Sequence, residues 1–265
     1  MKKRIIIISI WVTLILGLIV LVYLMGKRHN EKKCSKVEIK INYKDDNYFV
    51  TVDDIKAMIN KKDDSIVGKP LSNINISEIE KKISASPYIL QTDVYSTVEG
   101  VIKINAIQRK PIARIINKFN LSYYIDEEGM LMPLSPKYVA RVIIANGDIN
   151  DLYSPFIKLK VDSGKTTDSL VKKTAVYKIY MLSKFIDADE FWKAQIGQIY
   201  FSESGDIELI PLLGDNRIIF GDISDIKEKF ANLKAFYEKG LSELGWNYYK
   251  TINIKFKNQI VCSKK

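Results

Sequence analysis

The residues best suited to chemistry in this 265-residue sequence are few and far apart. There is one histidine, His29, and there are two cysteines, Cys34 and Cys262. Nucleophilic catalysis by serine or cysteine needs a histidine held in a shaped site, and His29 lies in a polar run. Three such residues cannot form a histidine and cysteine cluster for zinc. Together with the lack of phosphate-binding glycine motifs, this predicts no metal site, no cofactor and no enzyme.

The acidic run Asp126-Glu127-Glu128 is the other group that resembles catalytic residues. Acid–base catalysis needs carboxylates that converge on one substrate. Three adjacent acids followed by Gly129 are instead typical of a turn, so we expect them to point in different directions and to face water. We also expect no disulfide, because Cys34 and Cys262 lie near opposite ends of the chain and a bridge needs Cα atoms within about 7 Å.

The net charge of +10 is concentrated at the two ends of the chain. Residues 1–36 carry +7 and residues 243–265 carry +4, which leaves −1 for the long middle stretch. A nucleic-acid-binding protein places its positive charge on the folded body. The charge distribution therefore argues against a nucleic-acid partner.

Residues 5–25 are 21 residues without a charge, rich in isoleucine, leucine and valine. As a helix they would be about 32 Å long, enough for a bilayer core of roughly 30 Å. No alanine precedes Ala57, so a signal-peptide cleavage site is not expected. We predict a tail at 1–4, a retained transmembrane anchor at 5–25 and a polar linker at 26–36. The flanking lysines and arginines leave the orientation open.

Residues 37–111 predict a small mixed unit. Alternation predicts a strand over 37–42, helices are predicted to begin at Thr51 and Ser77, and two further strands cover 94–98 and 101–107. The order β-α-α-β-β is that of a POTRA domain, and equally that of other small α+β domains.

Residues 112–265 predict a mainly antiparallel β domain with flanking helices, so that the whole chain is of the α+β class. Expected strands are 123–125 and 130–131 around the acidic turn, 141–145, a hairpin formed by 199–201 and 207–209, 218–220, and a last strand at 248–256. Expected helices cover 168–186 and 224–240.

The most specific motif is Arg109-x-Pro111-Ile112-Ala113-Arg114, followed by Ile125-Asp126-x-x-Gly129. With the order of elements around it, the chain resembles the FtsQ/DivIB family of bacterial cell-division proteins nearly from end to end. One departure is Gln108, where the family usually has an acidic residue. We assign Arg109, Pro111 and Arg114 to the domain junction. The two arginines are expected to be solvated at the end of a strand, with a partner-binding pair as the alternative.

The resemblance implies a non-catalytic divisome scaffold that connects FtsB-like and FtsL-like bitopic proteins to septal cell-wall synthesis. It implies a single-pass protein of the inner (cytoplasmic) membrane at the septum, with a cytoplasmic N-terminus, an extracytoplasmic body and no small-molecule substrate. The alternative is a POTRA-type chaperone or translocation component for β-rich exported proteins, which normally has several POTRA repeats or a barrel. A cell-wall hydrolase would need a pair of acids or a metal site.

The resemblance also implies a partner-binding surface on the final strand and the helix near it. An open edge strand offers unpaired N–H and C=O groups to an incoming strand. Period 2 places Tyr248, Ile252 and Phe256 on the inward face and Tyr249 on the outward face. The candidate partner-binding residues are Tyr248, Tyr249, Lys250, Ile252, Phe256 and Phe236.

Overall fold

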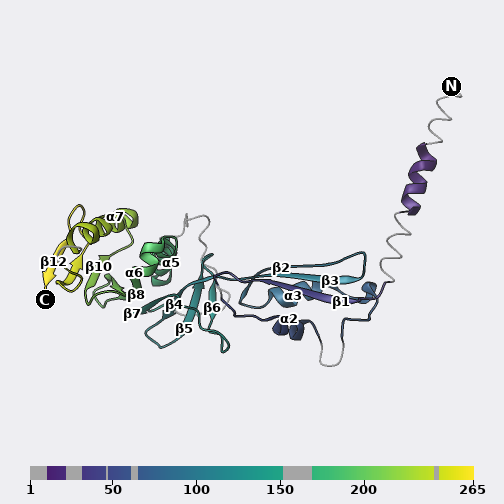
Figure 1. The fold of residues 1–265 in the computed structure, drawn as a ribbon, viewed down its shortest axis with the longest axis horizontal. Helices are drawn as coiled ribbons and strands as arrows, with labels where there is room; N and C mark the ends of the chain where they lie inside the picture. The colour runs from purple at the N-terminus through teal and green to yellow at the C-terminus, as the bar shows by residue number, and fades with distance from the viewer. Residues whose placement is uncertain (1–10, 22–31, 46, 61–64, 152–168, 242–244) are drawn as a thin grey trace, which may run out of the picture. The chain divides into compact units, whose positions relative to one another are not determined.

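The chain folds into two compact units, Met1–Gln108 and Arg109–Lys265 (Figure 1). The computed structural model describes residues 11–21, 32–45, 47–60, 65–151, 169–241 and 245–265. The boundary between the units falls three residues before the one expected at 111/112.

Residues 11–21 of the expected anchor are helical, and their apolar side chains are exposed. Within the described ranges, no helix is both long enough and apolar enough to span a bilayer. The remainder of the predicted anchor, the tail at 1–4, most of the linker and His29 lie outside the described residues.

Apart from the helix at 11–21, the described residues of the first unit form a three-stranded sheet, two α-helices and a short 3-10 turn. The elements follow one another as β1 (Lys36–Asn42), α2 (Val52–Ile59), the 3-10 turn η1 (Leu71–Asn73), α3 (Ile76–Ser84), β2 (Ile89–Ser96) and β3 (Val101–Gln108). In the sheet order β1-β3-β2, β1 is parallel and β2 antiparallel to the central β3. This confirms the β-α-α-β-β order predicted from the sequence.

Two N-caps fix the starts of these helices. Thr51 and Asp54 form the predicted capping box of α2. Helix α3 begins earlier than expected, because the cap is Asn75, whose side chain accepts from the backbone N–H of Glu78, and not Ser77. Both helices bury isoleucines against the sheet: Ile55, Ile59, Ile79 and Ile83.

The first unit also includes the end of the predicted linker. The backbone N–H of Cys34 donates to the carbonyl of Lys69, and Gly68 donates to the carbonyl of Cys34, both at 2.8 Å. The N–H of Ser35 donates to the carbonyl of Gly100 at 2.8 Å. These bonds make Cys34 and Ser35 part of the first folded unit. Both cysteines are free thiols.

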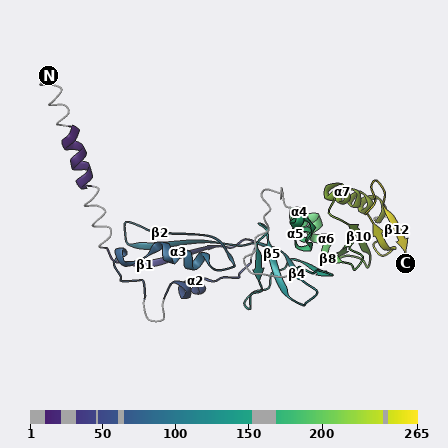
Figure 2. The same cartoon turned by 180° about the vertical axis from the view of Figure 1, so that it is seen from behind.

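The second unit is built on one nine-stranded mixed sheet in the order β12-β11-β10-β9-β8-β7-β4-β5-β6. Figures 1 and 2 show this unit from opposite sides. The β7 strand is parallel to both neighbours and β10 is parallel to β11, whereas the other pairs are antiparallel. The strands are β4 (Pro111–Ile116), β5 (Ser122–Asp126), β6 (Leu131–Pro133), β7 (Ile143–Gly147), β8 (Ile196–Phe201), β9 (Ile207–Pro211), β10 (Arg217–Gly221), β11 (Tyr249–Asn253) and β12 (Val261–Lys264).

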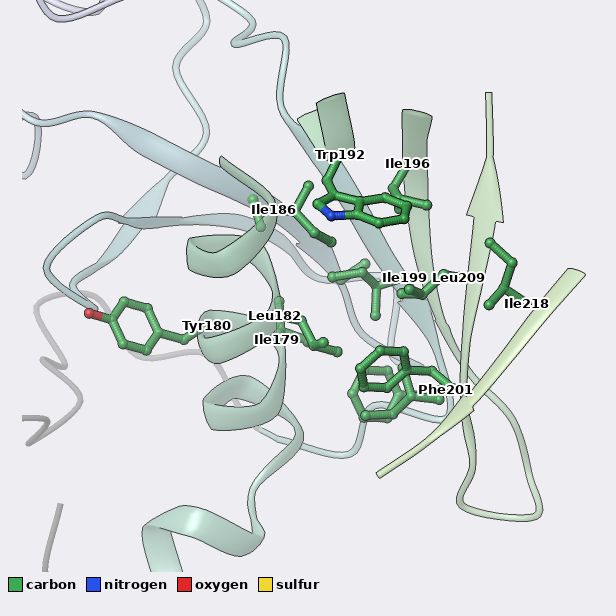
Figure 3. Close-up of a cluster of buried hydrophobic side chains, with 14 of the residues drawn as sticks. Ile179, Tyr180, Leu182, Ile186, Trp192, Ile196, Ile199, Phe201, Leu209 and Ile218 are labelled. Atoms are coloured by element: carbon green, nitrogen blue, oxygen red, sulfur yellow. The ribbon is translucent and has the colours of Figure 1, made fainter. Parts of the chain in front are cut away.

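Helices pack on one face of this sheet. They are α4 (Ser169–Lys173), α5 (Ala175–Asp187), α6 (Glu190–Gln195), α7 (Ile226–Phe236) and the π-helical turn η2 (Tyr237–Leu241). The register aligns Ile199, Leu209, Ile218 and Ile252 across four strands, and all four are fully buried in one cluster with helix residues (Figure 3). The alternate strand positions on the other face are only partly buried or exposed.

The structure differs from the sequence-based prediction in the second unit at three places. The helix expected over 168–186 is divided at Thr174, whose hydroxyl caps α5 by accepting from Tyr177 N–H. A short helix, α6, buries Trp192 against the core and was not predicted. The strand expected over 248–256 covers only Tyr249–Asn253, and a further strand, β12, follows it.

Candidate partner-binding surface

The predicted docking strand is not at the edge of the sheet. β11 pairs with β10 on one side, through Arg217–Thr251 to Ile219–Asn253, and with β12 on the other, through Tyr249–Lys264 to Asn253–Val261. The expectation of an open edge at 248–256 is therefore wrong for this strand. The unpredicted β12 ends the sheet among the described residues.

The β12 strand has the properties of an accessible edge. Its four residues are Val261, Cys262, Ser263 and Lys264, and all but Cys262 are exposed. Cys262 packs against the core, and its burial raises the pKa of its thiol. An edge strand carries one row of backbone N–H and C=O groups that no strand in its own sheet pairs with. The sheet has a second edge at β6, which is three residues long, and β12 is the edge that lies in the C-terminal region where the docking surface was expected.

Tyr248, which precedes β11, and Tyr249, its first residue, show the opposite burial to that expected. Tyr248 is 37% exposed, whereas Tyr249 is partly buried and packs on Phe236 of α7 with ring centroids 5.8 Å apart. The two tyrosine rings meet edge to face at 4.8 Å. A register shift between Tyr249 and Thr251 in the pairing with β12 breaks the simple alternation on which the prediction rested.

The exposed Tyr248 is linked to the edge strand itself. The ammonium of Lys264, in β12, lies 5.3 Å from the centre of the Tyr248 ring. A hydrogen bond with Tyr248 raises the pKa of Lys264. The ring and the ammonium form one amphipathic feature beside the free edge.

The other candidate residues separate into core and surface positions. Ile252 is fully buried in the core, and Phe236 is partly buried against it. Lys250 is exposed, and Phe256 is 47% exposed, which contradicts its predicted inward orientation. Exposed apolar area near the edge therefore comes from Tyr248, Phe256 and Val261.

Ion pairs hold the edge hairpin at both ends. Lys255, after β11, pairs with both carboxylate oxygens of Asp206 in the β8–β9 turn, at 2.8 and 3.0 Å. Lys265 pairs with Asp215 in the β9–β10 turn at 3.1 Å. The N–H of Ile254 donates to the carbonyl of Ile219. These links join the β11–β12 hairpin to the β8–β9 turn, to the β9–β10 turn and to β10.

At the junction between the units, Gln108 and Arg109 each bond within a different unit. The Gln108 side chain is fully buried and bonds three backbone groups of the first unit: it accepts from Phe49 and Val50 N–H and donates to the Asn47 carbonyl. Arg109 donates to Asp126 of the second unit at 2.7 Å. Sequence reasoning had treated Gln108 only as a departure from a family pattern.

The remaining junction residues also have fixed places. Pro111 begins β4 and is buried. The Arg114 Nε donates to the Ser122 hydroxyl across the β4–β5 pair at 2.9 Å. With its side chain only 13% exposed, Arg109 is not the solvated residue that was expected.

The acidic turn is a turn, as predicted, but Asp126 does not face water. It is 1% exposed, and its carboxylate accepts from Arg109, from Glu128 N–H and from Met130 N–H. Burial raises the pKa of Asp126, and these hydrogen bonds act against that rise. The carboxylate closes its own turn, and within the described ranges no group of three or more His, Cys, Asp and Glu could hold a metal ion.

Comparison with known families assigns both units. The family model described as FtsQ/DivIB, C-terminal related, matches residues 110–263, and the model described as POTRA-like domain matches residues 32–107. No curated protein matches the chain significantly. The first match covers more than half of the chain, and the second covers both helices and all but the last residue of the three-stranded sheet on which they pack.

Proposed function

Because this chain belongs to the FtsQ/DivIB family of cell-division proteins, we propose that it is a non-catalytic scaffold of the divisome. In this role it connects FtsB-like and FtsL-like bitopic proteins to the septal cell-wall synthesis machinery. The proposal places it in the cytoplasmic membrane at the septum, with its N-terminus inside the cell and both folded units outside. The uncharged run at 5–25 supports the membrane anchor, and the orientation follows from the family resemblance.

The observation that carries the proposal is that β12 is an edge strand of the nine-stranded sheet. We propose that a partner strand adds to this edge by backbone hydrogen bonds, which give affinity, while neighbouring side chains give specificity. Tyr248, Phe256 and Lys250 contact the partner in this arrangement. Tyr249, Ile252 and Phe236 do not contact the partner and instead stabilise β11 by packing in or against the core.

A pair of proline substitutions in β12 tests strand addition. Successive residues of an antiparallel strand direct their N–H groups to opposite sides, so one of Cys262 and Ser263 faces β11 and the other faces the free edge. We expect one of Cys262→Pro and Ser263→Pro to lower the melting temperature. The other variant should keep the parent's melting temperature and bind the partner at least about tenfold more weakly. An incoming strand loses one backbone hydrogen bond there and is obstructed by the proline ring.

The measurement is a binding titration of the full chain in detergent with purified FtsB-like and FtsL-like proteins, paired with thermal melts. Wild-type affinity in both proline variants would exclude the β12 edge as the docking site. If neither protein binds the unmodified chain, the scaffold role is wrong for these partners.

A further inference from the structure

Two turns of the first unit meet at the segment through which the chain enters it. Residues 32–35 bond to the turn at 65–70, through Cys34 with Lys69 and Gly68, and to the turn at 97–100, through Ser35 with Gly100. The N–H of Leu71 also donates to the carbonyl of Lys32 at 2.8 Å. We call this end of the unit, residues 32–35, 65–70 and 97–100, the tip.

The tip exposes apolar side chains on rigid backbone. Val98 is 74% exposed and Val67 is 49% exposed. Val67 precedes Gly68, and Val98 lies two residues before Gly100; both glycines have positive φ. A Cβ on Gly100 would lie 2.7 Å from the Lys33 carbonyl, so the turn at 97–100 approaches the entering segment closely. The two valines are thus held outward and not left on a loose loop.

Lysines lie beside these valines. Lys32 and Lys33 are exposed on the entering segment, and the Lys32 ammonium donates to the carbonyl of Val98 at 2.8 Å. Lys69 belongs to the turn that carries Val67, and Glu99 is the one acid among the tip residues. Exposed apolar groups with lysines around them fit a surface that is apolar inside and carries anionic phosphates outside.

The short stretch of chain between the uncharged run and the tip favours a bilayer as that surface. Lys32 follows the last residue of the uncharged run, Met25, by seven residues, which can span at most about 25 Å. A tether this short keeps the tip at a high effective concentration beside the lipid, so even a weak contact is occupied.

We propose that the tip rests on the anionic lipid surface beside the anchor. Val98 and Val67 enter the headgroup region, and Lys32 and Lys33 pair with phosphates. This inference rests on the membrane location in the proposed function. The contact would hold the first unit in one orientation on the membrane instead of letting it turn freely about its tether.

Spin labels on the full chain test the contact. A nitroxide is attached through Val98→Cys in a Cys262→Ser background, and a matched control carries it through Val139→Cys, a valine of the second unit that is 64% exposed. Cys34 is 1% exposed and burial raises its thiol pKa, so it should not react. The protein is reconstituted in phosphatidylcholine vesicles with and without phosphatidylglycerol.

The quantity compared is the ratio of the label's collision rate with oxygen to its collision rate with a water-soluble nickel complex. We expect this ratio to be several-fold higher for the Val98 label than for the Val139 label. The difference should grow with phosphatidylglycerol. Adding Lys32→Glu and Lys33→Glu should return the Val98 label to water while the Val139 label stays unchanged.

Three results would overturn the inference. A Val98 label as accessible to nickel as the Val139 label excludes lipid contact, while partner binding by the unlabelled parent chain in the same vesicles would leave the scaffold role intact. Shielding from both oxygen and nickel means that protein, such as a second copy, covers the tip. Failure of the chain to insert into vesicles would refute the membrane placement and the tip contact together.

Discussion

Arg109 and Asp126, 17 residues apart in sequence, form a buried ion pair in which Arg109 Nη1 lies 2.7 Å from Asp126 Oδ2. The pair joins the residue that begins the second unit to the turn between β5 and β6. Because Gln108 is bonded within the first unit, two adjacent residues secure the chain on the two sides of the unit boundary.

Arg109→Ala should destabilise the second unit by about 3 kcal/mol, since it leaves the Asp126 carboxylate buried without its charged partner. Denaturant unfolding monitored by circular dichroism measures the loss. Arg217→Ala is the control, because Arg217 is exposed and lies 3.7 Å from Glu208, so its removal should cost less than about 1 kcal/mol. Equal losses in the two variants would contradict a structural role for the buried pair.

Gln108→Glu should destabilise the first unit by roughly 1–3 kcal/mol at neutral pH. An ionised carboxylate can still accept from Phe49 and Val50, but it cannot donate to the Asn47 carbonyl, which now lies 2.6 Å from Gln108 Nε2. The protonated acid can donate, so the defect should shrink as the pH falls. Urea titrations at pH 4 and pH 8 compare the variant with the parent, and a loss that does not depend on pH would refute this account.

The Asp222 carboxylate should contribute to acid unfolding. Hydrogen bonds from Lys229 and Ser224 lower the pKa of Asp222 from 3.8 to about 2. Because the pKa is lower in the folded state than in the unfolded state, the carboxylate stabilises the fold fully at a pH above 3.8. This contribution to the free energy of unfolding is lost as the pH falls to about 2. Since Asp222 is mostly exposed, the contribution is at most about 1 kcal/mol. Asp222→Asn should therefore lose less stability between pH 4 and pH 2 than the parent, and unchanged loss would contradict the assignment.

Tyr248→Ala should weaken partner binding by roughly 1–3 kcal/mol and leave the melting temperature nearly unchanged, because the ring is exposed beside the edge strand. Ile254→Ala, at a position 2% exposed, should destabilise the fold by roughly 2–5 kcal/mol. Tyr249→Ala should also lower stability, through its contact with Phe236. Binding titrations with paired melts separate the effects, and wild-type binding by the Tyr248 variant would remove that residue from the surface.

Gly147→Ala should be far more damaging than Gly205→Ala. Both glycines have positive φ, but a Cβ on Gly147 would lie 2.1 Å from the Phe201 carbonyl, whereas one on Gly205 meets nothing within 4 Å. The Gly205 variant should lose about 1 kcal/mol from backbone strain alone. The Gly147 variant must also move β7 away from β8. Similar melting temperatures for the two variants would show that β7 and β8 can separate at little cost.

The first unit could be predicted from the sequence because its signals are local. Thr51 and Asp54 form a capping box that predicts the start of a helix, and apolar and polar residues alternate along β1. The prediction missed the pairing of residues 32–35, since that stretch has charged residues and no alternation. It forms because the two turns supply backbone partners that are distant in sequence.

The second unit was harder to predict where tertiary contacts override local pattern. The short β12 contains a serine and a lysine, so its sequence does not indicate a strand. It becomes one through its pairing with β11. A register shift then reversed the faces of Tyr248 and Tyr249. The burial of Asp126 depends on Arg109, and no local rule links those two positions.

The order of strands from β7 to β12 follows the order of synthesis, with each new strand laid beside the previous one. The sheet therefore lengthens toward β12 as the chain emerges, and the last strand to appear is the one that ends the sheet. A polypeptide interrupted before Val261 could form the other eight strands and still lack the proposed docking edge. A partner that recognises β12 itself would therefore bind only a chain whose sheet has been completed to this strand.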